Sequence, residues 1–166
     1  MPTDQSPPAS FDPAALRHAF GSFATGVTVV TALDARGNPV GLTANSFTSV
    51  SLEPPLVLWC IGLGTPSFVT FRDCSHYAIN VLSGDQEEIS NRFANPSPDK
   101  FAGLKYRRGI GGVPLLPGCI ASFECSNAAQ HPGGDHLILV GQVENYRVDI
   151  DAPLLFFSSN YAGLQA

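Results

Sequence analysis

Residues 41–58 have the sequence Gly-Leu-Thr-Ala-Asn-Ser-Phe-Thr-Ser-Val-Ser-Leu-Glu-Pro-Pro-Leu-Val-Leu. Their pattern predicts a β-strand, a stop at the two prolines and a second, apolar strand. Six short hydrogen-bonding side chains fall within nine of these positions: Thr43, Asn45, Ser46, Thr48, Ser49 and Ser51. Small hydroxyls and amides can bond the edge of a flat polar ligand without filling its space. The stretch is therefore either one wall of a ligand site or an ordinary Ser- and Thr-rich strand and turn.

The composition of the whole chain indicates a globular protein rich in β-structure. Of its 166 residues, 44% are hydrophobic and only 14% are charged, which excludes a disordered chain. The 16 Gly and 14 Pro residues imply many turns, and with runs of Val, Ile, Phe and Thr they favour short strands. We expect a flexible tail at residues 1–10, followed by a single domain over residues 11–166.

The charge and the cysteines indicate which partners and which cell compartment to expect. A net charge of −5 argues against a general nucleic-acid-binding surface. The sequence begins with no secretory signal, and no apolar run approaches the roughly 20 residues that span a membrane. The four cysteines show no Cys-x-x-Cys spacing. We therefore expect a cytoplasmic protein with reduced thiols and no membrane segment.

Strand patterns recur along the chain. They predict strands at residues 26–33, 40–45, 56–61, 77–82, 120–125, 135–148 and 154–157. The strand at 56–61 is nearly all apolar, so both of its faces should be covered. Turns are predicted at 34–39 and 130–135. Six or seven strands at this spacing predict a closed antiparallel barrel, with an open sandwich as the alternative.

Three helices are expected, and each is predicted from its cap residues. The first begins with Asp12 as N-cap and Pro13 at the first helical position. Its apolar face should point inward through residues at helical spacing: Leu16, Phe20 and Phe23. The third starts at a capping box formed by Asp85 and Glu88, and it ends near Asn95.

The remaining helix is expected to open at Thr65-Pro66-Ser67, with Thr65 as its N-cap. The exposed N–H groups of its first turn and the Ser67 hydroxyl would form an anion site. A basic cluster follows in residues 95–118, which read as a long loop: Lys100, Lys105, Arg107 and Arg108. This cluster is either a local anion site or a solvated basic loop.

Several enzyme classes are excluded by missing motifs. The chain has no Gly-x-Ser-x-Gly elbow, no Walker phosphate loop and no Gly-x-Gly-x-x-Gly opening a helix. His131 and His136 have no Cys or carboxylate that completes a familiar ligand spacing, so no metal site is expected. The remaining polar groups suit a phosphorylated planar cofactor better than nucleophilic catalysis. They are the small hydroxyls and amides, Ser67, Arg92 and His136, which follows a Gly-Gly-Asp turn.

The combination of motifs resembles the flavin reductase family with the FMN-binding split-barrel fold. Its members are the small reductase components of two-component flavin monooxygenases. The matching segments are residues 23–31, 41–47, 49–57, 80–82, 91–93, 99–103, 133–136 and 141–144. The resemblance implies a mainly β, antiparallel Greek-key split barrel with short flanking helices. It also implies a homodimer with the flavin near the interface.

The same resemblance implies the reaction and the partners. A hydride would pass from NADH or NADPH to FMN or FAD, and a flavin-dependent monooxygenase would receive the reduced flavin. Thr43, Asn45 and Ser46 would border the isoalloxazine ring and the ribityl chain. Three consecutive residues would pass along the flavin by their backbone: Cys60, Ile61 and Gly62.

Further roles are implied for residues later in the chain. Ser67 and Arg92 would hold the flavin phosphate, which agrees with the anion site expected from the helix start. Phe93 would support that pocket. Three residues would shape the entrance for the nicotinamide or the flavin: Lys100, Phe101 and Tyr161. Arg107 and Arg108 could meet a 2′-phosphate of NADPH, or could be solvated.

His136 would face the nicotinamide, where it would bond the carboxamide or stabilise charge as the flavin is reduced. The alternative is a strand-start His whose hydrogen bonds are satisfied by Asp135 or by backbone. Because no side chain need be a nucleophile, a non-enzymatic flavin carrier on the same fold is the competing function. A flavin-dependent oxidase on a related barrel would need an organic substrate, and no sequence feature demands one.

Overall fold

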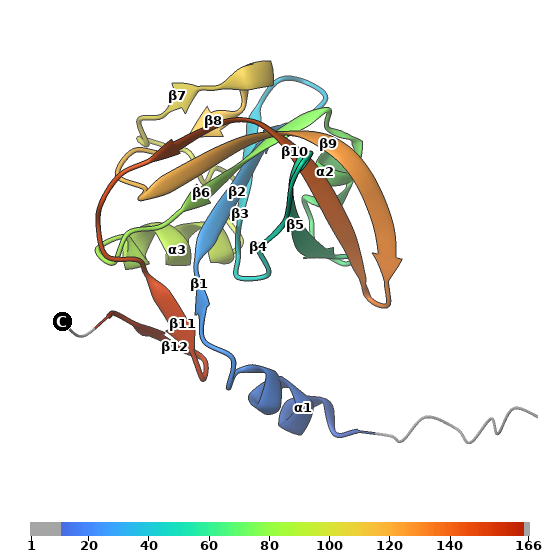
Figure 1. Cartoon of the computed structure of the whole chain (residues 1–166), viewed down its shortest axis with the longest axis vertical. Helices are drawn as coiled ribbons and strands as arrows, with labels where there is room; N and C mark the ends of the chain where they lie inside the picture. Colours follow the sequence, from blue (N-terminus) through green and yellow to red (C-terminus); the bar gives the residue numbers. More distant parts are fainter. Residues whose placement is uncertain (1–10, 165–166) are drawn as a thin grey trace, which may run out of the picture.

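The body of the molecule is one curled antiparallel sheet of seven strands (Figure 1). The computed structural model describes residues 11–164, so the tail expected at 1–10 lies outside the described residues. The strands of this sheet are β2 (Thr28–Leu33), β3 (Pro39–Ala44), β4 (Thr48–Leu52), β5 (Pro55–Gly62), β6 (His76–Val81), β9 (Ala121–Gly133) and β10 (His136–Val148). Their order is β3-β2-β6-β9-β10-β5-β4. The edge strands β3 and β4 follow each other in the chain without pairing, which leaves the barrel split and confirms the predicted fold class.

Smaller elements flank the barrel. A three-stranded sheet contains β1 (Thr25–Gly26), β11 (Leu155–Phe157) and β12 (Asn160–Ala162), and the helices are α1 (Pro13–Phe20), α2 (Phe68–Asp73) and α3 (Glu87–Ala94). The expected long loop holds a two-stranded ribbon, β7 (Arg107–Arg108) with β8 (Pro114–Leu115), and the 3₁₀ turn η1 (Ile110–Gly112). Within residues 11–164, no helix has both the length and the apolar character needed to cross a bilayer.

The turn between β2 and β3 forms where it was predicted. The Asp34 carboxylate accepts hydrogen bonds from the backbone N–H groups of Arg36, at 2.9 Å, and Asn38, at 2.8 Å. Gly37 follows with φ of 82°, a left-handed conformation that glycine adopts without steric cost. The side chain of Asp34 thus replaces the missing ladder bonds of the turn and sets the register of β2 against β3.

Burial along β5 differs from the prediction that both faces would be covered. Val57, Trp59 and Ile61 are 4%, 0% and 1% exposed, whereas Leu58 and Cys60, which point to the other face, are only partly buried. In an antiparallel barrel successive side chains alternate between the interior and the outside, and only the interior is filled. The prediction was wrong because an apolar composition does not reveal which face a barrel strand turns outward.

The β9–β10 hairpin is longer than predicted. The sequence predicted a turn at 130–135, but β9 continues to Gly133 and only Gly134 and Asp135 connect the strands. Beyond Ser126, β9 pairs with β10 but no longer with β6, so this part is a two-stranded arm. Pro132 is tolerated there because the outer edge of the arm needs no N–H donor.

Helix α1 begins as predicted but does not pack inward. The Asp12 carboxylate accepts a bond of 3.1 Å from the backbone N–H of Ala14, which caps the helix. Leu16, Phe20 and Phe23 are nevertheless 37%, 70% and 78% exposed. Figure 1 shows α1 below β1 and β11, away from the barrel, so within residues 11–164 these apolar side chains stay exposed.

The other two helices start later than their predicted caps. Helix α2 has Ser67 rather than Thr65 at its N-cap, because the Thr65 carbonyl first closes a turn with the N–H of Phe68. The capping box of α3 is absent, since the Asp85 carboxylate accepts from the Ser83 hydroxyl instead. The predicted end of α3 at Asn95 is confirmed.

Candidate functional site

A cleft of about 780 Å³ opens between β3, the chain around the start of α2, and the segment that follows α3. Its volume lies in the range of cavities that hold small-molecule ligands. Four of the predicted site residues line it: Thr43, Ser67, Lys100 and Phe101. Residues far apart in the sequence thus meet at one concave surface.

The β3 wall of the cleft is fixed to α3. The Thr43 hydroxyl donates a hydrogen bond of 2.6 Å to the carbonyl oxygen of Ser90, in the middle of α3. A Cβ atom on Gly41 would lie 2.6 Å from the Phe93 ring, so only glycine lets β3 approach this closely. Phe93 is fully buried and packs edge-to-face on Phe101, with ring centroids 5.0 Å apart. Phe93 therefore supports the wall from behind, whereas Phe101 forms part of the surface.

The α2 wall contributes hydroxyl groups. Thr65, Ser67 and Thr70 line the cleft, and the N–H of Thr65 bonds to the Gly62 carbonyl at 3.0 Å. The Ser67 side chain makes no capping bond to its own helix. Because α2 has only six residues, its dipole is small, and the hydroxyls are the main polar groups of this wall.

Other predicted residues hold the surroundings of the cleft together. The Lys100 ammonium donates to the Phe93 carbonyl at 2.6 Å, and its partial burial lowers its pKa. The Arg92 guanidinium donates to the carbonyl oxygen of Ala102, and Arg92 does not line the cleft. The Tyr161 hydroxyl lies 2.7 Å from the Ser90 hydroxyl, so it ties β12 to α3.

A second group of predicted residues surrounds the end of β5. The Ser46 hydroxyl accepts from the Cys60 N–H at 2.9 Å and lies 3.2 Å from the Cys60 carbonyl oxygen. These contacts continue the β4–β5 pairing beyond Thr48 and Leu58. Burial raises the pKa of the Cys60 thiol, which fits a packing residue. Ile61 is only 1% exposed as a whole residue, so it lies beneath the surface here, whereas Asn45 is exposed.

His136 lies opposite Gly62 across the β5–β10 ladder. A Cβ atom on Gly62 would lie 3.4 Å from the Thr65 hydroxyl and 3.7 Å from His136 Nε2, so Gly62 joins the second group to the cleft. His136 Nδ1 is 2.7 Å from the Asp135 carboxylate, and this bond lowers the pKa of Asp135. In the part of the chain that the structure describes, no three His, Cys, Asp or Glu side chains gather as metal ligands.

The sequence missed several residues of the cleft. Asp34, Thr70 and Asp99 line it, as do the prolines at 96 and 98. Thr65 was recognised as a helix-start residue but not as part of the site. Asp34 gave no functional signal, because its turn-forming role accounts for it, and only the curl of the sheet brings it near Thr70.

The structure is similar to solved flavin reductases. It superposes on the Streptomyces globisporus NADH:FAD oxidoreductase SgcE6, solved in complex with NAD and FAD fragments, with a TM-score of 0.88 and 38% identity over 93% of each chain. Residues 20–165 match the family described as the flavin reductase like domain. The chain therefore belongs to the flavin reductase-like family, as its motifs predicted.

Curated relatives agree with this assignment. A probable flavin reductase of Rhizobium meliloti is 52% identical over 80% of this chain and 43% of its own length. The reductase component of a flavin-dependent trigonelline monooxygenase from Acinetobacter baylyi is 46% identical over 90% of this chain and 45% of its own length. The chain thus spans about half the length of these curated relatives.

Proposed function

We infer that the chain is an NAD(P)H-dependent flavin reductase, which passes a hydride from NADH or NADPH to FMN or FAD. The observation that carries this function is the cleft formed by Thr43, Ser67, Lys100 and Phe101 in a split barrel of the flavin reductase-like family. The named activities of its relatives support the same reaction. The reduced flavin is supplied to a partner flavin-dependent monooxygenase, a role supported by the Acinetobacter relative.

The residues of the site fit a phosphorylated flavin. Thr43, Asn45 and Ser46 border its ring and ribityl chain. The backbone of three residues at the end of β5 passes along it: Cys60, Ile61 and Gly62. When bound, the flavin supplies the hydride-accepting chemistry, and the protein binds and orients both rings.

The phosphate is held by Ser67 together with Arg92. The Ser67 hydroxyl lines the cleft without a capping bond, so it is available as a donor. The Arg92 guanidinium has donors beyond the one that bonds to Ala102, so it can turn others toward an anion. Phe93 supports this end of the pocket, and three residues shape the entrance: Lys100, Phe101 and Tyr161.

His136 faces the nicotinamide. Its Nδ1 is engaged by Asp135, which fixes the ring and leaves Nε2 beside Gly62 for the carboxamide of the hydride donor. Gly62 leaves room for a flat ring at that position because it has no side chain.

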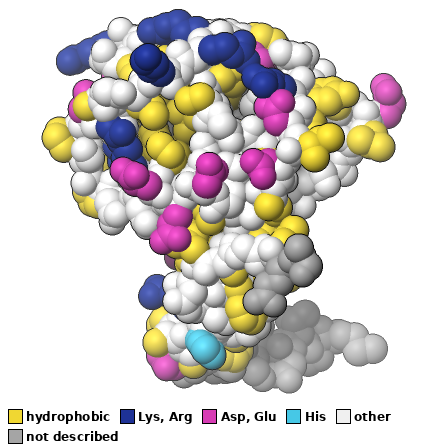
Figure 2. All heavy atoms as spheres, turned by 90° about the vertical axis from the view of Figure 1, so that its left-hand side faces the viewer, with side chains coloured by type: hydrophobic (Ala, Val, Ile, Leu, Met, Phe, Trp, Pro, Cys, Tyr) yellow, Lys and Arg dark blue, Asp and Glu magenta, His cyan; other side chains and the backbone are white. Residues whose placement is uncertain are grey.

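The proposed assembly is a homodimer. Its support is the apolar face of α1, where Leu16, Phe20 and Phe23 are exposed beside Phe157, which is 46% exposed. Figure 2 shows hydrophobic side chains on the narrow lobe below the barrel that contains α1. A second copy would bury this face, and sedimentation of the purified chain tests whether it forms the dimer.

The proposed location is the cytoplasm. Four unpaired cysteines support a reducing compartment of this kind.

Steady-state turnover tests the function directly. The purified chain should oxidise NADH or NADPH when FMN or FAD is present, in at least one of the four pairings. Absence of turnover in all four would overturn the proposal. A chain that binds flavin tightly but never reduces it would instead be a flavin carrier. That alternative is compatible with the site because the exposed His136 is the only side chain proposed to be catalytic.

A further inference from the structure

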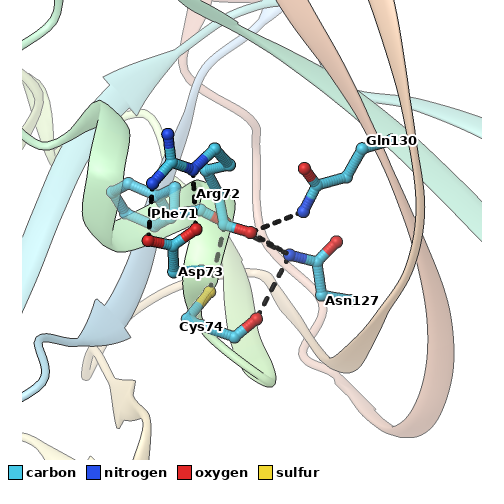
Figure 3. Close-up of polar contacts among 6 residues, drawn as sticks. All are labelled: Phe71, Arg72, Asp73, Cys74, Asn127 and Gln130. Atoms are coloured by element: carbon cyan, nitrogen blue, oxygen red, sulfur yellow. Dashed lines mark hydrogen bonds and ion pairs between the residues drawn. The ribbon is translucent and has the colours of Figure 1, made fainter.

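Two amide side chains of β9 bind the last turn of α2 (Figure 3). The Asn127 side-chain nitrogen lies 3.2 Å from the carbonyl oxygens of Phe71 and Cys74 and 3.5 Å from that of Arg72. The Gln130 side-chain nitrogen donates to the Arg72 carbonyl at 2.6 Å. We call Asn127 and Gln130 the α2 clamp.

The clamp supplies donors that the helix itself lacks. The last carbonyl groups of an α-helix have no partner within the helix. The Cys74 N–H satisfies the Thr70 carbonyl at 2.9 Å, and the Cys74 thiol is a weak donor to the Phe71 carbonyl at 3.4 Å. The clamp gives the Phe71 carbonyl an amide donor and supplies the donors to the Arg72 carbonyl. A helix of six residues with unsatisfied carbonyls at its end would fray, since so short a helix has little stability of its own.

The clamp also acts on the far end of the helix. Six residues span only about 9 Å, so a change in tilt at the last turn is transmitted to Ser67 at the first. The other anchor is Phe71, which is fully buried and packs edge-to-face on Trp59, with ring centroids 5.1 Å apart. Phe71 fixes the depth of the helix, and Phe68 at its first position is partly buried against the same core. The clamp adds the attachment at the last turn, where it opposes rotation about these two side chains.

The clamp belongs to the same hairpin that carries His136. Asn127 is the first residue of β9 beyond the last pair with β6, and its own N–H bonds to the Ser75 carbonyl at 2.9 Å. Six residues after Asn127 the strand ends at Gly133, which pairs with His136. One two-stranded arm therefore holds both α2, with the hydroxyls of Thr65 and Ser67, and His136 opposite Gly62.

We propose that Asn127 and Gln130 are positioning residues that set the Thr65–Ser67 wall of the flavin cleft through the last turn of α2. The proposal rests on the flavin reductase function inferred above. Neither clamp residue lines the cleft, so the clamp acts on it only through α2. Its loss should therefore change the affinity for flavin and leave the hydride donor's site intact.

The test uses Asn127→Asp and Gln130→Glu, singly and together. Each keeps the size of the side chain and removes its N–H donors, and each adds a negative charge beside the helix C-terminus, where it is unfavourable. Gln142→Glu is the matched control, because Gln142 is exposed on β10, pairs with Ser126 and Leu56, and lies outside the clamp. Gln130 is also exposed, so its single variant should fold.

We expect the double variant to raise the Kd and KM for flavin about tenfold, on the scale of one or two lost hydrogen bonds. The kcat at saturating flavin and the KM for the nicotinamide should stay near wild type. In the absence of flavin, the amides of residues 65–74 should exchange hydrogen faster than in the wild type and in the Gln142→Glu control. A lower unfolding temperature alone, with flavin affinity unchanged, would assign a purely structural role and overturn the proposal.

The two proposals fail in different ways. If the wild type neither binds nor reduces flavin, the proposed function fails, and the exchange of residues 65–74 still reports whether the clamp holds α2. If the wild type binds flavin and the clamp variants match it in affinity and in exchange, the positioning role is wrong while the function stands.

Discussion

The Tyr77 hydroxyl lies against the backbone of Gly141 inside the barrel, so that a methyl group added to Gly141 would overlap it. Tyr77 is fully buried on β6, and Gly141 faces it from β10. Among the described residues, neither this hydroxyl nor the indole N–H of Trp59 has a hydrogen-bond partner. The contact therefore arises from packing, and it explains why a glycine follows the apolar run 137–140 of β10.

Gly141→Ala should destabilise the fold by about 1–3 kcal/mol, the usual cost of overpacking a filled core. Tyr77→Phe removes the hydroxyl and should be close to neutral, because that group makes no bond. Denaturant unfolding of the two single variants and the double variant measures the coupling. The double variant should be more stable than Gly141→Ala alone, and equal losses would show that the hydroxyl is not what excludes a side chain.

Ser67→Ala combined with Arg92→Ala should weaken flavin binding at least tenfold, because hydrogen bonds to a charged phosphate contribute about 1.5–3 kcal/mol. Fluorescence titration with FMN measures the affinity. Arg147→Ala is a suitable control, since Arg147 pairs with Asp149 and does not line the cleft. Unchanged affinity in the double variant would show that Ser67 and Arg92 do not hold the phosphate.

His136→Asn should raise the KM for the nicotinamide about tenfold and leave the KM for flavin unchanged, because a bond to the carboxamide is lost. Steady-state kinetics with each substrate varied in turn separates the two constants. An equal rise in both constants would place His136 at the flavin instead.

The free energy of unfolding should depend on pH through Asp135, the residue that pairs with His136. The hydrogen bond to His136 lowers the pKa of Asp135 from its ordinary 3.8, so the carboxylate stabilises the fold above that value and loses this contribution as pH falls through its own, lower pKa. The free energies of unfolding of wild type and Asp135→Asn, measured across pH, test this contribution of the carboxylate. The difference should be small, since Asp135 is exposed, and it should vanish in acid; a difference that grows in acid would contradict the pairing.

Arg107→Ala with Arg108→Ala should leave the preference between NADH and NADPH unchanged. Both residues lie in β7, at the opposite end of the barrel from the turn that carries His136 (Figure 1), and neither lines the cleft. Figure 2 shows Lys and Arg side chains gathered at the end of the molecule remote from α1. The ratio of kcat/KM for the two nucleotides is the measurement, and a selective loss with NADPH would mean that the 2′-phosphate does reach β7.

The sequence predicted most of the strands, because local patterns determine them. The Asp34 turn, the cap at Asp12 and the position of β6 follow from residues close in the chain. The length of β9 does not follow from residues close in the chain, because its turn-forming residues at 130–133 are held extended by pairing with β10. Likewise, the outward face of β5 depends on where the sheet closes, which no local pattern specifies.

The candidate site residues were named from the family resemblance rather than from local patterns. Thr43, Ser67, Lys100 and Phe101 were recognised from motifs, and they meet at one cleft. The clamp at Asn127 and Gln130 carried no signal, because it links a strand to a helix some 55 to 58 residues earlier in the chain. The inward face predicted for α1 was wrong because an amphipathic pattern does not say which surface will cover it.

Anaerobic mixing of the protein with flavin and a reduced nicotinamide tests hydride transfer directly. The flavin absorbance is followed as NADH or NADPH is added to FMN or FAD. In at least one pairing, the flavin should be bleached as one equivalent of nicotinamide is oxidised, at a rate far above that without protein. A flavin that is bound yet stays oxidised with both nucleotides would contradict the proposed reductase function.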